Sequence, residues 1–181
     1  GDGAVKTLYE KGIHPDAIVG DLDSIPADLR KRYADRIHHL EDQEINDLSK
    51  SIRFAHAQGY REVLILGATG LREDHTLGNI SLLMEYAPLF KRVEMLSDYG
   101  LFTPILETTT FASYPGQQIS IFVLYPEGEI STEGLRWPIC QRKLTSWWQG
   151  TLNEALGNQF TVTLSPDCRV IIYREAPYTE K

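Results

Sequence analysis

Five acidic side chains stand in two short clusters near the start of the chain. Asp21 and Asp23 form the first cluster, and Asp42, Glu44 and Asp47 form the second. The first cluster follows a short apolar run, where packing gives no reason for a carboxylate. A hard divalent cation that carries phosphates gives such a reason, because it prefers oxygen ligands and neutralises phosphate charge. The residue types and their spacing therefore predict Mg²⁺ chemistry on a phosphorylated substrate.

The first acidic pair is predicted to lie at the carboxyl end of a parallel strand, residues 17–19, which is where open α/β sheets place ligands. Residues i and i+2 of an extended segment share a face, so we expect Asp21 and Asp23 to converge on one ion. A plain Asp-rich turn, or Ser24 capping a helix that Pro26 opens, is the alternative.

The second acidic cluster follows the next predicted strand, residues 37–40, and is expected at the same edge of the sheet. A helix N-terminus that favours acids for its dipole is the alternative, but it explains one or two carboxylates rather than five across two loops. Five uncompensated acids repel one another. Mg²⁺ relieves that repulsion, and it usually takes one or two carboxylates with water and phosphate in its other positions.

A glycine-containing segment, residues 67–75, follows the strongest strand pattern of the chain, residues 63–66. Small residues let the backbone approach a ligand, and a helix that starts near Asp74 aims N–H groups at an anion. Arg72 can bind phosphate oxygens through two parallel hydrogen bonds. The segment lacks the sequence of a nucleotide P-loop and the spacing of a dinucleotide fingerprint, so a tight strand-to-helix turn is the alternative. His75 is predicted to be a structural hydrogen-bonding residue.

Tryptophans mark two unusual stretches in the second half of the chain, residues 134–138 and 147–154. An exposed tryptophan can stack a flat heteroaromatic ring, especially a cationic one. For any single tryptophan, packing in the core of a small β-domain is the favoured alternative.

The elements that must position these residues fall into two parts. Residues 1–98 alternate short strands with helical patterns, which predicts an α/β domain with a mostly parallel sheet. A domain of this type that opens with a helix lacks its first strand, so we expect residues to precede Gly1. Helices are predicted over residues 4–11, 27–33, 47–58 and 77–86, and strands over residues 17–19, 37–40, 63–66 and 93–96. Asn46-Asp47 is predicted to cap the third of these helices. The strand over residues 63–66 is continuously apolar, which is typical of a strand covered on both faces.

The chain changes character after residue 98. Its β-rich segments are separated by Pro-Gly, Glu-Gly, Gly-Asn and Pro-Asp turn signals. Residues 104–181 are therefore predicted to form an all-β domain, a small sandwich, and residues 99–104 to form the linker. The predicted strands cover residues 108–111, 118–125, 129–132, 160–164 and 170–173.

Composition excludes several classes of protein. The chain has 181 residues, of which 42% are hydrophobic, and a formal charge of −7. That charge argues against a nucleic-acid binder, which needs a basic face. There is no run of about 18 apolar residues, so no membrane span is expected. Cys140 and Cys168 have neither zinc-site spacing nor a disulfide framework, which favours a reducing cytoplasm.

Taken together, the motifs resemble the thiamine pyrophosphokinase (thiamin diphosphokinase) family over nearly the whole chain. Residues 14–25 contain Pro-Asp and Gly-Asp-Leu-Asp-Ser, similar to the family's Pro-Asp…Gly-Asp-Phe/Leu-Asp-Ser signature. Residues 42–50 resemble its Asp-Gln-Asp-x-Thr-Asp-x-x-Lys element. The other similar segments are residues 2–4 (its Asp-Gly-Gly-Ala element), residues 67–75 with Asn79 (its Gly-rich Arg-x-Asp-His…Asn loop), and residues 134–137 and 150–154 (its thiamine-side elements).

The resemblance implies an α/β domain followed by a β-sandwich, in a homodimer with active sites between the subunits. It also implies transfer of pyrophosphate from ATP to the hydroxyl of thiamine, with Mg²⁺, to give thiamine diphosphate and AMP. The implied metal ligands are Asp21, Asp23, Asp42 and Asp47. The implied catalytic residues are Asp21, Asp23, Asp47, Arg72 and Asp74. Asp2, Asp42, Gln43, Arg72, His75 and Asn79 are implied to bind ATP, and Trp137, Thr151 and Asn153 to bind thiamine.

Four residues depart from the family pattern. Glu44 stands in place of an aspartate, which keeps the charge but lengthens the reach. Leu152 stands where the family usually has serine, which removes a hydroxyl from the thiamine side. Val5-Lys6 replaces the usual Ala-Asn.

Two other functions remain open. Another Mg²⁺-dependent transferase or nucleotide hydrolase would share the carboxylates but would not need the Trp and Gly-Thr-x-Asn elements. A non-catalytic thiamine- or nucleotide-binding protein would not need the acids, Arg72 or Asp74.

Overall fold

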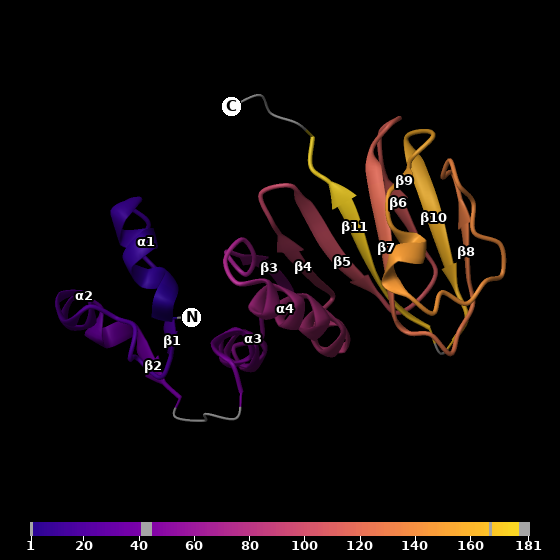
Figure 1. The fold of residues 1–181 in the computed structure, drawn as a ribbon. Helices are drawn as coiled ribbons and strands as arrows, with labels where there is room; N and C mark the ends of the chain where they lie inside the picture. The colour runs from indigo at the N-terminus through magenta and orange to yellow at the C-terminus, as the bar shows by residue number, and fades with distance from the viewer. Residues whose placement is uncertain (1, 41–44, 167, 178–181) are drawn as a thin grey trace. The chain divides into compact units, whose positions relative to one another are not determined.

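The computed structural model describes residues 2–40, 45–166 and 168–177 (Figure 1). The chain forms two compact units, Gly1–Tyr60 and Arg61–Lys181. Each unit has its own elements and its own packing, and each is described by itself below.

The first unit joins three helices to a small parallel sheet. Strands β1 (Ile18–Gly20) and β2 (Ile37–His39) pair in parallel, with Ile18 opposite Ile37. Apolar side chains from α1, β1, the turn after β1 and the α2 region pack together in its core: Val5, Ile18, Leu22, Ile25, Leu29 and Tyr33. The helical elements are η1 (Asp2–Ala4), α1 (Val5–Glu10), α2 (Ala27–Arg32), η2 (Ala34–Arg36) and α3 (Asp47–Ala57).

The start of α3 follows directly from its sequence. The Asn46 side chain accepts a hydrogen bond from the backbone N–H of Ser49 at 2.8 Å. This bond satisfies one of the N–H groups that have no partner inside the helix, which is why asparagine is favoured at this position. The predicted N-cap is confirmed, and it fixes where Asp47 enters the helix.

The second unit contains two sheets and one long helix. The larger sheet has six strands in the order β3-β4-β5-β11-β7-β9, and the smaller has three strands in the order β6-β10-β8. Helix α4 (Glu73–Tyr86) connects β3 to β4. The strands are β3 (Glu62–Leu66), β4 (Arg92–Leu96), β5 (Gly100–Ile105), β6 (Thr109–Ala112), β7 (Gln118–Tyr125), β8 (Ile130–Glu133), β9 (Asn153–Glu154), β10 (Gln159–Leu164) and β11 (Arg169–Glu175); two 3₁₀ turns, η3 (Ala87–Leu89) and η4 (Trp147–Gly150), complete the unit.

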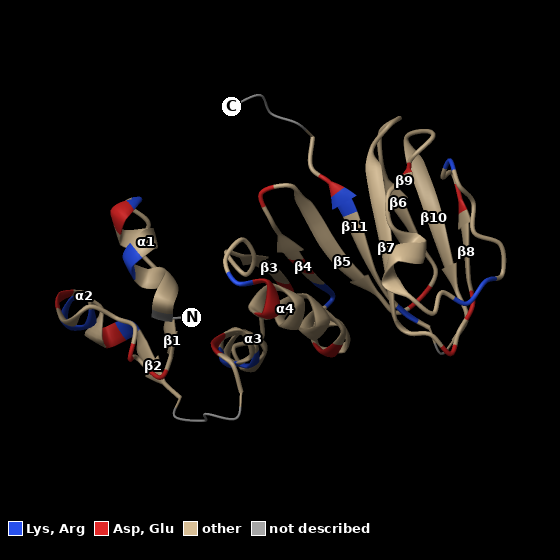
Figure 2. Ribbon diagram, in the orientation of Figure 1, with Lys and Arg blue, Asp and Glu red and all other residues tan. Residues whose placement is uncertain are grey.

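The two sheets of the second unit pack face to face as a sandwich. Their shared core takes Ile121 from β7, Ile172 from β11 and Phe160 from β10, each at most 1% exposed. The rings of Phe111 and Phe160 stack across β6 and β10 with their centroids 5.2 Å apart. Strands β6, β7 and β10 carry no charged residue (Figure 2), as expected for strands that line a core. The predicted β-rich second half is confirmed.

One detail of the sequence prediction is wrong, and another is not confirmed. Residues 99–104, predicted as a linker, lie mostly in strand β5, which pairs antiparallel with both β4 and β11. A tight turn over residues 97–100 returns the chain beside β4, and the apolar residues Leu101 and Phe102 then pair with Leu96 and Met95. This sheet is therefore mixed, because only β3 and β4 are parallel within it. The predicted mostly parallel sheet is not confirmed, although parallel pairs occur in both units.

Strand β3 is covered on one face only within the second unit. Ile65 is 5% exposed, whereas Leu64 and Leu66 are 54% and 65% exposed. The continuous apolar run predicts coverage on both faces. In the structure, buried and exposed side chains instead alternate along β3.

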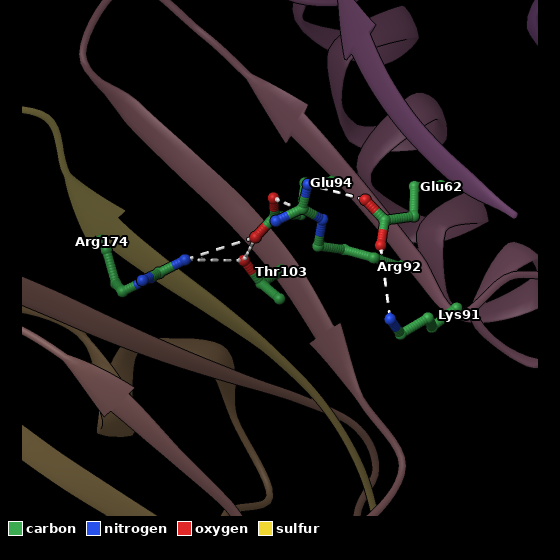
Figure 3. Close-up of polar contacts among 6 residues, drawn as sticks. All are labelled: Glu62, Lys91, Arg92, Glu94, Thr103 and Arg174. Atoms are coloured by element: carbon green, nitrogen blue, oxygen red, sulfur yellow. Dashed lines mark hydrogen bonds and ion pairs between the residues drawn. The ribbon is translucent and has the colours of Figure 1, made fainter.

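A polar row crosses the six-stranded sheet from β3 to β11 (Figure 3). Arg92 contacts Glu62 at 3.0 Å, and Thr103 donates a hydrogen bond to Glu94 at 2.9 Å. The guanidinium of Arg174 donates to both Glu94 and Thr103 at 3.3 Å. Burial lowers the pKa of Arg174, and the charge of Glu94 opposes that effect. These side-chain contacts link the four strands β3, β4, β5 and β11.

Helix α4, the longest in the described ranges, is 14 residues long. Across residues 2–40, 45–166 and 168–177, no helix is both long enough and apolar enough to pass through a membrane.

Candidate functional site

The acidic segment after β1 is a turn rather than an extended strand end. The Asp21 side chain accepts a hydrogen bond from the backbone N–H of Asp23 at 3.3 Å. Leu22 between them has φ = 71° and is 5% exposed, because its side chain packs in the core of the first unit. The expectation that Asp21 and Asp23 share a face of an extended segment is therefore wrong. The backbone turns at Leu22, whose side chain is buried, and the convergence of Asp21 and Asp23 on one ion stays a prediction.

A buried lysine brings two of the predicted carboxylates together. The ammonium Nζ of Lys50 lies 3.9 Å from Asp21 Oδ2 and 3.6 Å from Asp47 Oδ1. Lys50 is 2% exposed, while the two acids are 38% and 43% exposed. Asp47 and Lys50 are three residues apart on α3, so they lie on one side of the helix. The carboxylate oxygens of Asp21 and Asp47 therefore face a common position that now holds a positive charge.

Sequence reasoning did not assign a role to Lys50. The residue stands at the end of the segment that resembles the family's second acidic element. Its spacing of three residues from Asp47 indicates an ion pair on one face of a helix. That spacing does not predict burial, because lysine is rarely buried. The pairing partner Asp21 comes from a different part of the sequence.

The other predicted metal ligands do not contact Lys50 within the described residues. Asp23 is exposed and is linked to Asp21 through its backbone N–H. Asp42, Gln43 and Glu44 lie outside the described residues, as does the side chain of Asp2. Within the described part of the chain, no group of three or more His, Cys, Asp or Glu residues is arranged to hold a metal ion.

The glycine-containing loop leads from β3 into α4 in the second unit. Gly67 and Gly70 have φ values of 68° and 90°, a backbone region that residues with a Cβ rarely adopt. The Asn79 side chain on α4 donates a hydrogen bond to the Ala68 carbonyl at 2.9 Å, and the Thr76 hydroxyl donates to the Arg72 carbonyl at 3.1 Å. Asn79 therefore holds the loop against the helix. Its predicted contact with ATP stays a prediction.

Arg72 and Asp74 form a two-bond ion pair at the start of α4. The guanidinium donates from Nη2 to Asp74 Oδ2 at 2.6 Å and from Nε to Oδ1 at 3.1 Å. The pKa of Asp74 is lowered mainly by the hydrogen bonds from the Arg72 guanidinium. The backbone N–H of His75 makes the second largest contribution. Both side chains are exposed, at 74% and 61%. The guanidinium is therefore oriented by Asp74 and still open to solvent.

The tryptophans of the second unit do not fill its core. Trp137, Trp147 and Trp148 are 55%, 41% and 75% exposed, which contradicts the core-packing alternative. Trp137 and Trp148 line a cavity of about 470 Å³ together with residues of the Gly-Thr-Leu-Asn segment. The guanidinium of Arg136 lies 5.2 Å from the centre of the Trp137 ring and pairs with Glu154 at 3.4 Å. One side of that ring is therefore already in contact with a cation.

Asn153 is buried, and its side chain is bonded to the backbone around Trp137. Its oxygen accepts a hydrogen bond from the Trp137 N–H at 3.1 Å, and its amide donates to the Trp137 carbonyl at 2.7 Å. Thr151 donates its hydroxyl to the Trp148 carbonyl at 2.8 Å. Leu152 is 73% exposed with φ = 58°. In this segment the polar side chains hold the loop, and Leu152 presents an apolar surface.

Comparison with known families agrees with this arrangement. The model of the thiamin pyrophosphokinase catalytic domain matches residues 1–96, and the model of the thiamin pyrophosphokinase substrate-binding domain matches residues 100–173. The chain therefore belongs to the thiamin pyrophosphokinase family.

Curated relatives have the same family name. Thiamine pyrophosphokinase 1 of Oryza sativa subsp. japonica is 32% identical over 139 residues, which cover 68% of this chain and 52% of the relative. Thiamine pyrophosphokinase of Bacillus subtilis is 36% identical over 86 residues, 45% of this chain and 40% of the relative. The chain spans about half the length of the curated relatives it matches.

Solved structures share the fold. Thiamin pyrophosphokinase from Geobacillus thermodenitrificans superposes with a TM-score of 0.80 at 24% identity, covering 98% of this chain and 85% of that one. The Candida albicans thiamin pyrophosphokinase gives a TM-score of 0.80 at 18% identity, covering 97% and 80%. The two-part architecture of the family is thus present in this chain.

Proposed function

We propose that this chain transfers pyrophosphate from ATP to the hydroxyl of thiamine, giving thiamine diphosphate and AMP. The observation that carries the proposal is the presence of both family domains in order, the catalytic domain over residues 1–96 and the substrate-binding domain over residues 100–173. We propose the same functional division, with residues 1–98 binding nucleotide and metal and residues 104–181 binding thiamine.

Mg²⁺ is proposed as the metal, because the donors at the first acidic site suit it. Asp21 and Asp47 each hold one carboxylate oxygen within 4 Å of Lys50 Nζ, so the two carboxylates lie near each other and could bind a metal ion beside that lysine. Two carboxylates are the number that Mg²⁺ usually takes from a protein. Asp23 and Asp42 are proposed as the further carboxylates of this site. When bound, Mg²⁺ supplies charge neutralisation for the phosphates.

Arg72 is proposed to hold the transferring phosphates. Its guanidinium is exposed and already oriented by Asp74, so it can turn its free N–H groups to phosphate oxygens. The hydroxyl oxygen of thiamine bonds to the β-phosphorus, the bond from that phosphorus to the bridging oxygen of AMP breaks, and the hydroxyl proton passes to a base. The protein's contribution is mainly positioning and charge stabilisation. Asp2, Gln43, His75 and Asn79 are proposed to line the ATP side of the site.

Thiamine is proposed to bind at the exposed tryptophan surface of the second unit. Trp137 offers a ring face to a cationic heteroaromatic ring, and Thr151 lies in the same cavity. Asn153 supports this site by fixing the backbone of Trp137. A homodimer with shared active sites and a cytoplasmic location complete the proposal.

Release of AMP, measured with and without thiamine in the presence of Mg²⁺, tests the proposal. Thiamine-dependent AMP formation is the expected result. Hydrolysis that ignores thiamine would instead indicate a nucleotide hydrolase. Absence of turnover, with thermal stabilisation by thiamine or ATP, would indicate a binding protein without catalysis.

A further inference from the structure

A polar cavity lies in the first unit, outside every site described above. It has a volume of about 470 Å³, within the range of small-molecule sites. Its lining contains two arginines, a histidine, a tyrosine and an aspartate: His14, Arg32, Tyr33, Asp35 and Arg36. The proposed function gives no role to any of these five residues.

The cavity lies at the edge of the small sheet opposite to the first acidic cluster. His14 precedes strand β1, and Arg36 precedes strand β2. Because these two strands are parallel, their first residues share one edge of the sheet, whereas Asp21 follows β1 at the other edge. The cavity is therefore separate from the proposed metal site.

Tyr33 gives this cavity a rigid base. It is 4% exposed and packs in the core of the first unit. Its hydroxyl oxygen lies 2.6 Å from Nδ1 of His14, and its ring centre lies 5.9 Å from the guanidinium carbon of Arg36. The Arg36 guanidinium also donates a hydrogen bond to the Pro15 carbonyl at 2.9 Å. Both polar side chains are thus held in place before a ligand arrives, which lowers the cost of binding.

The contact with Tyr33 leaves one nitrogen of the His14 ring available. When the phenol donates to Nδ1, the neutral imidazole carries its hydrogen on Nε2. His14 is exposed, and its Nε2 makes no hydrogen bond to the part of the chain that the structure describes. His14 therefore offers an N–H donor at the wall of the cavity.

Arg32 brings a second guanidinium to the cavity. It lies 5.2 Å from the centre of the Tyr9 ring, and it pairs with no carboxylate of residues 2–40, 45–166 and 168–177. The last turn of α2 also contains Arg30 and Lys31 (Figure 2), and all three cations favour the helix dipole. Of these three residues, only Arg32 lines the cavity. Stabilisation of the helix explains the charge but not its position at the cavity.

The fixed charges of the lining leave an excess of one positive charge, because two arginines stand against one aspartate. Asp35 is 78% exposed, and its carboxylate reaches Nε of Arg36 only at 3.9 Å. A contact this long and this exposed is weak, so most N–H groups of Arg36 remain available. The chain as a whole has a formal charge of −7, which makes a positive cavity a local exception.

We infer that this cavity binds a phosphate group, either as inorganic phosphate or as the end of a small phosphate monoester. Two guanidinium groups and an imidazole N–H suit the several oxygens of that anion, because arginine binds phosphate through parallel hydrogen bonds. The volume leaves room for an organic part beside the phosphate. Binding here requires neither Mg²⁺ nor thiamine, so the inference goes beyond the proposed function and does not depend on it.

The test follows the ring signals of His14 by NMR while the full chain is titrated with inorganic phosphate. Mg²⁺ is absent, the pH is constant, and chloride keeps the ionic strength constant. We expect a saturating shift with a dissociation constant of about 1 mM. His14→Gln identifies the signal among the five histidines. A second titration, with glycerol 3-phosphate, distinguishes the sources: tighter binding indicates a monoester, and equal or weaker binding indicates phosphate itself.

Arg32→Gln is expected to weaken phosphate binding by about tenfold, because one charge-assisted partner of the anion is lost. Arg30→Gln removes the same charge from the same helix outside the cavity, and as the matched control it should stay within about twofold. Arg72→Ala, which removes the guanidinium proposed for the phosphates of ATP, should leave the His14 titration unchanged. Without added phosphate, thiamine-dependent AMP release by Arg32→Gln should match that of the wild type.

Three results would overturn the inference. The first is a His14 shift that does not saturate or that chloride reproduces at equal ionic strength. The second is equal weakening in Arg32→Gln and Arg30→Gln, which would show only a general attraction to the charge of α2. The third is loss of the shift in Arg72→Ala. Arg32 is exposed, so its variant should fold, and urea unfolding checks this. A failure of the proposed function appears in AMP release and leaves these titrations unaffected.

Discussion

Two ion pairs of this protein have similar chemistry and opposite environments. In the first unit, Lys50 is 2% exposed and lies within 4 Å of both Asp21 and Asp47. In the second unit, Arg72 and Asp74 are bonded at 2.6 Å while both are more than half exposed. The buried lysine has the longer contacts and the exposed arginine the shorter ones. Contact distance alone therefore does not indicate which pair matters for folding.

Burial decides that question. A buried charge that loses its partners is costly, whereas an exposed pair contributes little to stability because water screens it. Lys50 therefore fixes the positions of Asp21 and Asp47 before any ligand arrives. The exposed Arg72 is held by Asp74 in a defined direction and remains available to a ligand. The Lys50 pair therefore orders side chains within the first unit, and the Arg72 pair leaves a guanidinium of the second unit available to a ligand.

The largest expected effect is on an exposed carboxylate beside the buried pair. Asp23→Asn is expected to reduce thiamine-dependent AMP formation by about a thousandfold, because it removes a charge proposed to face Mg²⁺ and phosphate. Its free energy of unfolding should hardly change, since Asp23 is exposed and does not contact Lys50 in the described structure. Steady-state kinetics and urea unfolding measure the two effects.

Asp28→Asn is the matched control for this variant, because Asp28 is an exposed aspartate on the neighbouring helix α2. It should keep nearly normal turnover. Near-normal turnover of Asp23→Asn, with an unchanged requirement for Mg²⁺, would remove Asp23 from the metal site.

Arg72 should show the next largest effect, again on activity. Arg72→Ala is expected to lower kcat/KM for ATP by about a hundredfold, since a guanidinium bonded to the transferring phosphates would be lost. Arg72→Lys should recover only part of this loss, because an ammonium group cannot make two parallel hydrogen bonds. Both variants should unfold at nearly the wild-type urea concentration. A large loss of stability in Arg72→Ala would mean that the pair with Asp74 is structural after all.

Lys50 should reverse this pattern, with the primary effect on stability. Lys50→Ala is expected to lower the free energy of unfolding by about 2 kcal/mol, because Asp21 and Asp47 lose their shared partner and a buried side chain is removed. Lys50→Met retains most of the volume and separates packing from charge. Lys6→Ala, in an exposed pair with Glu10, is the control and should change the free energy of unfolding by less than about 0.5 kcal/mol. Equal effects of Lys6→Ala and Lys50→Ala would contradict the distinction between the two pairs.

The sequence predicted the parts of this comparison that depend on local patterns. The Asn46 cap, the position of Asp47 on α3 and the glycines at residues 67 and 70 each follow from short-range rules of helices and turns. The sequence did not predict that Leu22 would be buried in a left-handed conformation between Asp21 and Asp23. That conformation depends on the core of the whole unit.

Non-local pairing accounts for the other failures. Residues 99–104 have the sequence of a linker, and they form strand β5 because they pair with β11, about 70 residues later in the chain. Burial of Lys50 depends on Asp21, which lies on the loop after β1. The sequence predicts Asn153 as a polar contact for a ligand, and in the structure its amide donates to the Trp137 carbonyl. In each case the partner of the residue or strand lies in another segment of the chain.

The smallest expected effect concerns the titration of Asp74. Arg72 and the N–H of His75 lower its pKa from the ordinary value of 3.8, so Arg72→Gln should raise the Asp74 pKa back toward 3.8. A group whose pKa is lower in the folded state contributes stability that is present above its unfolded pKa and is lost as the pH falls through the folded value. For Asp74 this window lies below about pH 4. Because the pair is exposed, acid unfolding of Arg72→Gln should follow that of the wild type, while NMR titration of the Asp74 carboxyl shows the shift. Arg36→Gln, which removes a guanidinium from the first unit, should leave the Asp74 titration unchanged. An Asp74 pKa that does not move in Arg72→Gln would mean that the guanidinium does not hold this carboxylate in solution.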